Sequence, residues 1–211
     1  MLLELNRLEV PPGQRLRLHD VTWDEFEEIL QSLGDRRASR LAYTNGILEI
    51  AMPSPEHEDA KEIIGDLIKA LLEELDLEFR SLGSTTFKQP QRQGLEPDQC
   101  FYIENEAVIR GKKRIDLAID PPPDLAIEID VTSRTYPSIY EAIAVPELWQ
   151  FAQDQMSIKV LQNGTYIDAE ESPRFPSFPL KTALPQYLQQ SEIAGRNRTI
   201  RAFRSWVRSC L

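Results

Sequence analysis

Residues 124–131 constrain the fold more than any other part of the chain. Three consecutive prolines at positions 121 to 123 precede this segment and force an extended connection into it. Apolar residues then alternate with small or acidic ones, and this alternation is the pattern of a β-strand with its apolar side chains on one face. We expect this strand to be central, within a mixed α/β (α+β) fold.

Periodicity elsewhere predicts the elements around this strand. Thr22 and Glu25 have the spacing of a capping box, which starts a helix that ends near Gly34. Asn-Gly pairs at positions 45–46 and 163–164 predict β-hairpins. Apolar residues recur at helical spacing up to residue 75, so residues 56–75 should form the longest helix. Further strands are expected at residues 14–18, 39–43, 47–52, 77–81, 85–88, 100–103, 148–152, 156–161 and 165–169, with a short helix at 139–143 and a Gln/Arg/Gly-rich loop before 96–98.

Length and composition limit the organisation of the protein. The 211 residues are close to the usual size of one domain, so residues 1–211 are expected to share one core, with residues 184–211 as a helical C-terminal extension. No stretch approaches the ~20 apolar residues of a membrane span, and the first ten residues do not read as a secretory signal. We therefore expect a cytoplasmic protein without a membrane partner.

Cysteine usage and common motifs exclude several classes of protein. Cys100 and Cys210 have no CxxC partner, so we expect two free thiols and no cysteine-based zinc site. The chain also lacks a Walker A loop, a GxGxxG loop before a helix, an HExxH helix and a GxSxG elbow. Nucleotide hydrolysis, nicotinamide chemistry and serine hydrolysis are accordingly poor hypotheses.

Acidic residues are the strongest candidates for chemistry. The strand alternation places Glu128 and Asp130 on one face, and Asp98 leads into a neighbouring predicted strand. Mg²⁺ prefers carboxylate and carbonyl oxygens, so Asp98, Glu128 and the carbonyl of Ile129 could form an open metal site suited to phosphate chemistry. The alternatives are that Asp98 is only a turn residue and that Glu128 and Asp130 form the solvated face of an antiparallel sheet.

The order of several short motifs adds a resemblance. The motifs are Pro97-Asp98, the run from Pro123 to Ser133, and Val145-Pro146-Glu147-Leu148-Trp149, together with Thr22-Trp23-Asp24-Glu25-Phe26, Gly46-Ile47-Leu48-Glu49 and Pro53-Ser54-Pro55-Glu56-His57. In this order they resemble the Uma-type family of bacterial putative restriction endonucleases, which is placed in the PD-(D/E)XK nuclease superfamily.

The resemblance implies a fold and a metal site. It implies a restriction-endonuclease-like core over residues 21–169, with a central mixed sheet flanked by helices, an N-terminal hairpin and the helical extension beyond the core. It also implies that Asp98 and Glu128 bind a divalent metal, Mg²⁺ or Mn²⁺. The superfamily lysine is missing because Asp130 stands at its position, and Arg134 is a poorer substitute.

Two further residues and the C-terminal tail have open alternatives. His57 could contact the metal water or a phosphate, or could be a polar residue at a helix N-terminus. Glu49 could face the same site or could face water. The tail contains Arg196, Arg198, Arg201, Arg204 and Arg208 with Phe203 and Trp206. It could bind phosphates and bases, or form an amphipathic helix whose arginines are solvated or pair with the acidic body.

The function predicted from these observations is metal-dependent cleavage of DNA. A homodimer would place two sites about a two-fold axis for cutting both strands. The net charge of 24 − 34 = −10 opposes this hypothesis because it repels phosphate. The alternative is a catalytically weakened or inactive protein of the same fold that acts as a binding or assembly module.

Overall fold

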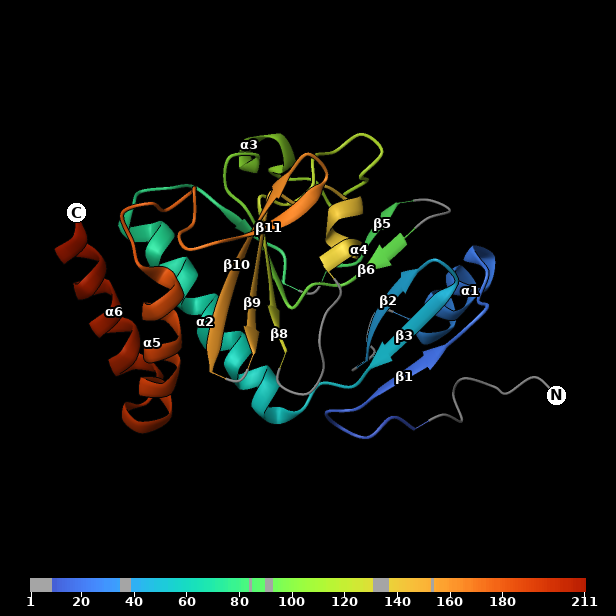
Figure 1. The fold of residues 1–211 in the computed structure, drawn as a ribbon, viewed down its shortest axis with the longest axis horizontal. Coiled ribbons are helices and arrows are strands. Elements are labelled where there is room, and N and C mark those ends of the chain that lie inside the picture. The colour runs from blue at the N-terminus through green and yellow to red at the C-terminus, as the bar shows by residue number, and fades with distance from the viewer. Residues whose placement is uncertain (1–8, 35–38, 84, 90–92, 131–136, 153) are drawn as a thin grey trace.

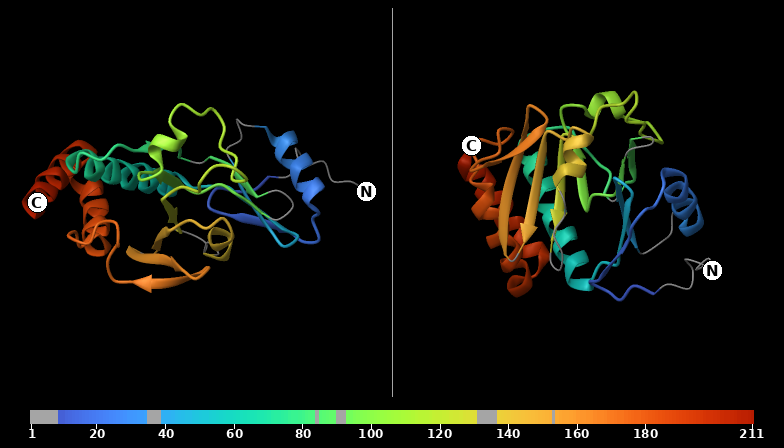
Figure 2. Two further views of the ribbon diagram at one scale, coloured as in Figure 1. Left: turned by 90° about the horizontal axis from the view of Figure 1, so that it is seen from above. Right: turned by 45° about the vertical axis from the view of Figure 1, so that its right-hand side comes forward.

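Two β-sheets with helices at both ends form the protein. The computed structural model describes residues 9–34, 39–83, 85–89, 93–130, 137–152 and 154–211. Helices α2, α5 and α6 lie on one side of the sheets and α1 lies at the opposite end, as Figure 1 and the two turned views of Figure 2 show. The mixed α/β fold expected from the sequence is confirmed.

The first sheet is antiparallel throughout. Its strands are β1 (Arg15–Leu18), β2 (Arg40–Thr44), β3 (Ile47–Ala51), β5 (Phe87–Gln89) and β6 (Gln93–Leu95), in the order β1-β3-β2-β6-β5. Asn45 and Gly46 join β2 to β3 with φ angles of 49° and 78°, the left-handed conformation of the predicted hairpin turn. Helix α1 (Trp23–Leu33) begins with the predicted capping box of Thr22 and Glu25. It buries Phe26 against this sheet.

Strand β6 is an element that the sequence analysis missed. Its residues were expected to be part of a polar, glycine-containing loop, yet β6 pairs with both β2 and β5. The ring of Phe26 lies so close to Gly94 that a Cβ on that residue would lie 2.6 Å from the ring. Glycine at this position therefore permits α1 to pack directly on the strand, which is a tertiary contact and has no local sequence signal.

The second sheet contains the predicted central strand. Its strands are β4 (Arg80–Ser81), β7 (Gln99–Tyr102), β8 (Leu125–Ile129), β9 (Glu147–Ala152), β10 (Gln155–Gln162) and β11 (Thr165–Ala169), in the order β11-β10-β9-β8-β7-β4. Strands β8 and β9 are parallel and the other pairs are antiparallel, so the sheet is mixed as expected. Strand β8 lies inside the sheet, between β7 and β9. The short helix α3 (Glu106–Ile109) precedes it and was not predicted.

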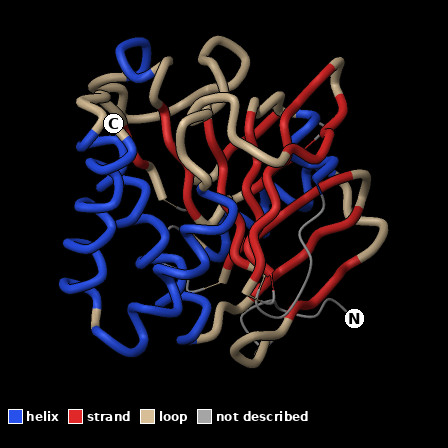
Figure 3. The backbone as a smooth tube through the Cα atoms, turned by 60° about the vertical axis from the view of Figure 1, so that its left-hand side comes forward, coloured by secondary structure: helices blue, strands red, loops and turns tan. Residues whose placement is uncertain are grey.

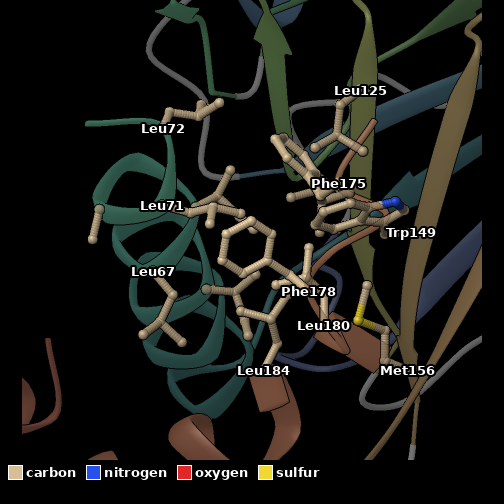
Figure 4. Close-up of a cluster of buried hydrophobic side chains, with 14 of the residues drawn as sticks. Leu67, Leu71, Leu72, Leu125, Trp149, Met156, Phe175, Phe178, Leu180 and Leu184 are labelled. Atoms are coloured by element: carbon tan, nitrogen blue, oxygen red, sulfur yellow. The ribbon is translucent and has the colours of Figure 1, made fainter. Parts of the chain in front are cut away.

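A large core fills the space between the second sheet and three helices. These helices are α2 (Pro55–Glu74), α5 (Leu180–Ala194) and α6 (Arg196–Cys210), which lie together on one face of the sheet (Figure 3). Figure 4 shows Leu67 and Leu71 of α2 on one side of this core and Trp149 of β9 and Leu125 of β8 on the other, with Phe178 between them. The extension expected at residues 184–211 is helical, but α5 begins at Leu180 and Gly195 separates it from α6.

The opposite face of β8 is also buried. Ala126 of β8 and Leu148 of β9 pack there with Leu95 of the first sheet and Tyr140 of α4 (Pro137–Ala142). All five residues of β8 are consequently buried, and the side of the strand that carries Glu128 does not face open solvent. The alternative of a solvated sheet face for Glu128 is wrong, because α4 and the first sheet cover it.

Candidate active site

Asp98 connects the two central strands that carry the candidate site. It lies immediately before β7 and is only 2% exposed. Register pairing between β7 and β8 ends at Gln99 and Ile127, and one of the Asp98 carboxylate oxygens then accepts a 2.6 Å hydrogen bond from the backbone N–H of Ile129. Asp98 therefore extends the strand ladder with its side chain, a role beyond that of a turn residue.

Glu128 lies on the face of β8 that α4 covers. The hydroxyl of Tyr140 on α4 donates a hydrogen bond to its carboxylate. Burial raises the pKa of Glu128 to about 7, and the charge of Asp130 acts in the same direction, while the hydrogen bond from Tyr140 opposes the shift. Near neutral pH the metal-free protein thus holds Glu128 partly protonated.

His57 approaches Asp98 from the first turn of helix α2. The side chain of Ser54 caps this helix by accepting from the backbone N–H of His57. The cap directs the imidazole toward the sheet, where Nε2 lies 3.0 Å from Oδ2 of Asp98. Burial, and then the positive charge of Arg40, lower the pKa of His57 to about 4, so the ring is neutral at neutral pH.

Three arginines of the first sheet complete the surroundings. Arg40 of β2 forms an ion pair with Asp98. Arg15 and Arg17 of β1 donate to the two carboxylate oxygens of Glu49 on β3, at 2.5 Å and 2.8 Å. Of the two positions that the sequence left open for Glu49, the site or water, the structure shows the first.

These arginines were not identified from the sequence, although a signal was present. In β1 and β2 the arginines alternate with apolar residues, so Arg15, Arg17 and Arg40 must share the face opposite the apolar one. The antiparallel register then places Arg17 directly opposite Glu49. What the sequence did not show is that this polar face points toward the second sheet.

Asp130 lies at the edge of this arrangement, after the end of β8. Asp130 accepts from the amide of Gln150 at 3.3 Å, and one of its oxygens lies 3.8 Å from Arg15. It does not line the cavity described below. Arg134 lies outside the described residues, so its predicted role is untested.

A cavity of about 320 Å³ joins the candidate residues of the two sheets. Asp98, Glu128 and Ile129 form its wall on the side of the second sheet. The first sheet and the start of α2 form the opposite wall, which carries Arg15, Arg17, His19, Arg40, Glu49 and His57 among apolar neighbours. The predicted pair of carboxylates therefore shares one cavity, with cationic side chains around it. Among the residues that the structure describes, no group of three or more His, Cys, Asp or Glu side chains is arranged to hold a metal ion.

The basic tail lies away from this cavity. Arg196, Arg204 and Arg208 of α6 pair with acidic residues on α2, namely Asp66, Glu73 and Glu74. Phe203 is buried in the core on the same side of the second sheet. The geometry favours the amphipathic alternative, in which the tail pairs with the acidic body of its own chain.

The two sheets and the cavity between them have a counterpart among solved structures. A crystal structure of a putative nuclease belonging to DUF820 from Anabaena variabilis ATCC 29413 matches this fold with a TM-score of 0.54 and 18% identity. The match covers 80% of this chain and 99% of that one.

The family follows from the sequence match. Residues 23–193 match the family model of Uma2, described as putative restriction endonuclease, and the chain belongs to that family. None of the curated proteins matches the chain. No helix within the described ranges has the length and apolar character that crossing a membrane requires.

Proposed function

We propose that this protein is a divalent-metal-dependent DNA endonuclease that acts in the cytoplasm. The observation that carries the proposal is that Asp98 and Glu128 line one cavity, where the backbone N–H of Ile129 binds the Asp98 carboxylate. Membership of a family of putative restriction endonucleases supports phosphodiester hydrolysis as the reaction. The residues of the cavity then have separable roles.

The donor set fits a hard cation such as Mg²⁺ or Mn²⁺. In a strand the N–H and C=O of one residue point to the same edge, so the Ile129 carbonyl faces the same edge as the N–H that binds Asp98. Two carboxylates and one carbonyl leave room for the waters that Mg²⁺ retains. When bound there, the cation would polarise a phosphate oxygen and lower the pKa of a coordinated water.

The other cavity residues position these ligands and the substrate. His57 and the Ile129 N–H fix the orientation of the Asp98 carboxylate, and Tyr140 fixes that of Glu128. Arg15 and Arg17 are held by Glu49, and a carboxylate oxygen of Asp130, which does not line the cavity, lies 3.8 Å from Arg15. Arg134 is retained as a further candidate, as a poorer substitute for the missing lysine.

The cavity also answers the objection from net charge. DNA is repelled by a protein of charge −10 at long range, so binding must depend on a local basic surface. Arg15, Arg17 and Arg40 gather on the first-sheet wall of the cavity and outnumber Glu49, with which two of them pair. The tail arginines Arg204 and Arg208 instead pair with acidic residues of α2. We therefore place the DNA contact at the cavity.

The test is plasmid cleavage with matched variants. The wild-type protein should nick or cut plasmid DNA with Mg²⁺ or Mn²⁺ and not with EDTA, while Asp98→Asn and Glu128→Gln should each abolish cleavage. Asp168→Asn is the control, because this carboxylate is exposed on β11 and pairs with Lys159. Equal cleavage by all variants would contradict the proposal.

A binding or assembly module remains the second candidate. It is favoured by the absence of any lysine between Lys113 and Lys159, since a lysine of the superfamily motif would activate water or stabilise charge. DNA binding at the cavity without cleavage under any metal would support it over the enzyme.

A further inference from the structure

Arg40 occupies a position with two carboxylate partners of different exposure. It pairs with Asp98, whose side chain is 3% exposed, and Nη2 donates at 2.9 Å to Glu58, whose side chain is 42% exposed. The guanidinium itself is largely buried. Arg40 is therefore held between the interior of the cavity and its rim.

The carboxylate of Asp98 is fully engaged by the protein itself. Arg40 pairs with Oδ1, while Oδ2 accepts from Ile129 and lies within hydrogen-bond distance of His57. Among these three neighbours, Arg40 has the permanently charged side chain, so it balances the negative charge of Asp98. A buried carboxylate requires such a partner, because an unpaired charge in the interior is costly.

We propose that Arg40 is the resident counter-cation of the metal-free site, and that a divalent cation binds Asp98 by displacing it. This inference rests on the proposed function, because it concerns the same metal site. The displaced guanidinium keeps its contact with Glu58 and turns toward the phosphate of the substrate. Arg40 then supplies, from the first sheet, the positive charge that a lysine at position 130, just after β8, would have supplied.

The surroundings of Arg40 suit this movement. Glu58 is anchored by Lys61 at 2.5 Å, so it offers a fixed point at the rim about which the arginine can turn. The cavity lies directly beside Arg40 and provides the space. A guanidinium has five donors in a planar fork, which allows it to hold Glu58 and bind a phosphate at the same time.

The first test measures metal affinity and does not depend on cleavage. Mn²⁺ binding to the EDTA-treated and dialysed protein is followed by calorimetry for wild type, Arg40→Met and Arg204→Met. Arg40→Met should bind Mn²⁺ roughly tenfold more tightly or better, because a positive charge that competes for Asp98 is gone. Arg204→Met removes an arginine paired with α2 on the far side of the second sheet and should leave the affinity unchanged.

Two failures are distinguishable in this test. Mn²⁺ binding by wild type with no tightening in Arg40→Met overturns the displacement and leaves the proposed function intact. No Mn²⁺ binding by any of the three proteins overturns the metal site, and the displacement with it. If Arg40→Met does not fold, ¹⁵N spectra of the arginine side chains in wild type decide: the Arg40 Nε–H signal should shift on addition of Mg²⁺, and an unshifted signal overturns the proposal.

The second test addresses the phosphate contact. Affinity for a DNA duplex is measured against salt concentration with Ca²⁺, used as a probe cation, and with EDTA. With Ca²⁺, Arg40→Met should lower the slope of log affinity against log salt by about 0.9, the value for one lost phosphate contact. With EDTA the slope should not change, because Arg40 is then held by Asp98. Equal slopes for both proteins under both conditions would overturn the phosphate role.

Discussion

Replacing Glu128 by Gln should stabilise the metal-free protein, and more so as the pH rises. Gln keeps the shape of the side chain and an oxygen that can accept from Tyr140, but it removes the buried charge. The pKa of Glu128 in the folded protein is about 7, against an ordinary value of 4.5. At 1.36 kcal/mol per pKa unit, this difference amounts to about 3 kcal/mol.

The sign follows from proton binding. Between pH 4.5 and 7 the folded wild type retains a proton on Glu128 that the unfolded chain has lost. The contribution of Glu128 to stability is therefore fully present below pH 4.5 and is lost as the pH rises through 7. Glu128→Gln has no such loss, so its advantage over wild type should grow from a small value near pH 5 to about 3 kcal/mol at pH 8.

Urea unfolding in the presence of EDTA, followed by tryptophan fluorescence at pH 5, 6, 7 and 8, measures this advantage directly. The comparison with wild type is needed because the contribution of His57 to stability depends on pH in the opposite sense. The pKa of His57 is about 4 in the folded protein, so its contribution to stability is lost as the pH falls below 6.5. A stability difference between the two proteins that stays constant from pH 5 to 8 would refute the assignment of a buried, partly protonated Glu128.

Three other predictions concern the Tyr140 contact, the C-terminal helix α6 and the oligomeric state. Tyr140→Phe removes the hydrogen bond that favours the charged form of Glu128, so the pKa of Glu128 should rise further. ¹³C NMR of the side-chain carboxyl measures this pKa, and a lower value would contradict the contact. Arg204→Gln should leave the salt dependence of DNA binding unchanged, because Arg204 pairs with α2; a slope lower by about 0.9 would show that the tail contacts phosphate. Sedimentation at micromolar protein should show a homodimer, and a monomer would favour the nicking of single strands.

Local signals determined much of the fold in advance. The capping box at Thr22, the two Asn-Gly turns and the helical spacing in residues 56–75 each act over a few residues, and the structure has α1, both hairpins and α2 at those places. The alternation in residues 124–131 also predicted an interior strand, because apolar residues at every second position require a covered face. By contrast, β6 and α3 depend on contacts with distant residues and were missed.

The candidate site was predictable only in part. The sequence indicated Asp98, Glu128 and Ile129 as candidate metal ligands, with His57 and Glu49 as candidate neighbours. The structure brings all five to one cavity. The place of Arg40 against Asp98 was not predictable, since it requires the N-terminal hairpin to lie over the ends of β7 and β8. Sequence spacing fixes which face of a strand a side chain occupies. Only the packing of the two sheets decides which residues cover that face, and therefore whether Glu128 is solvated or buried.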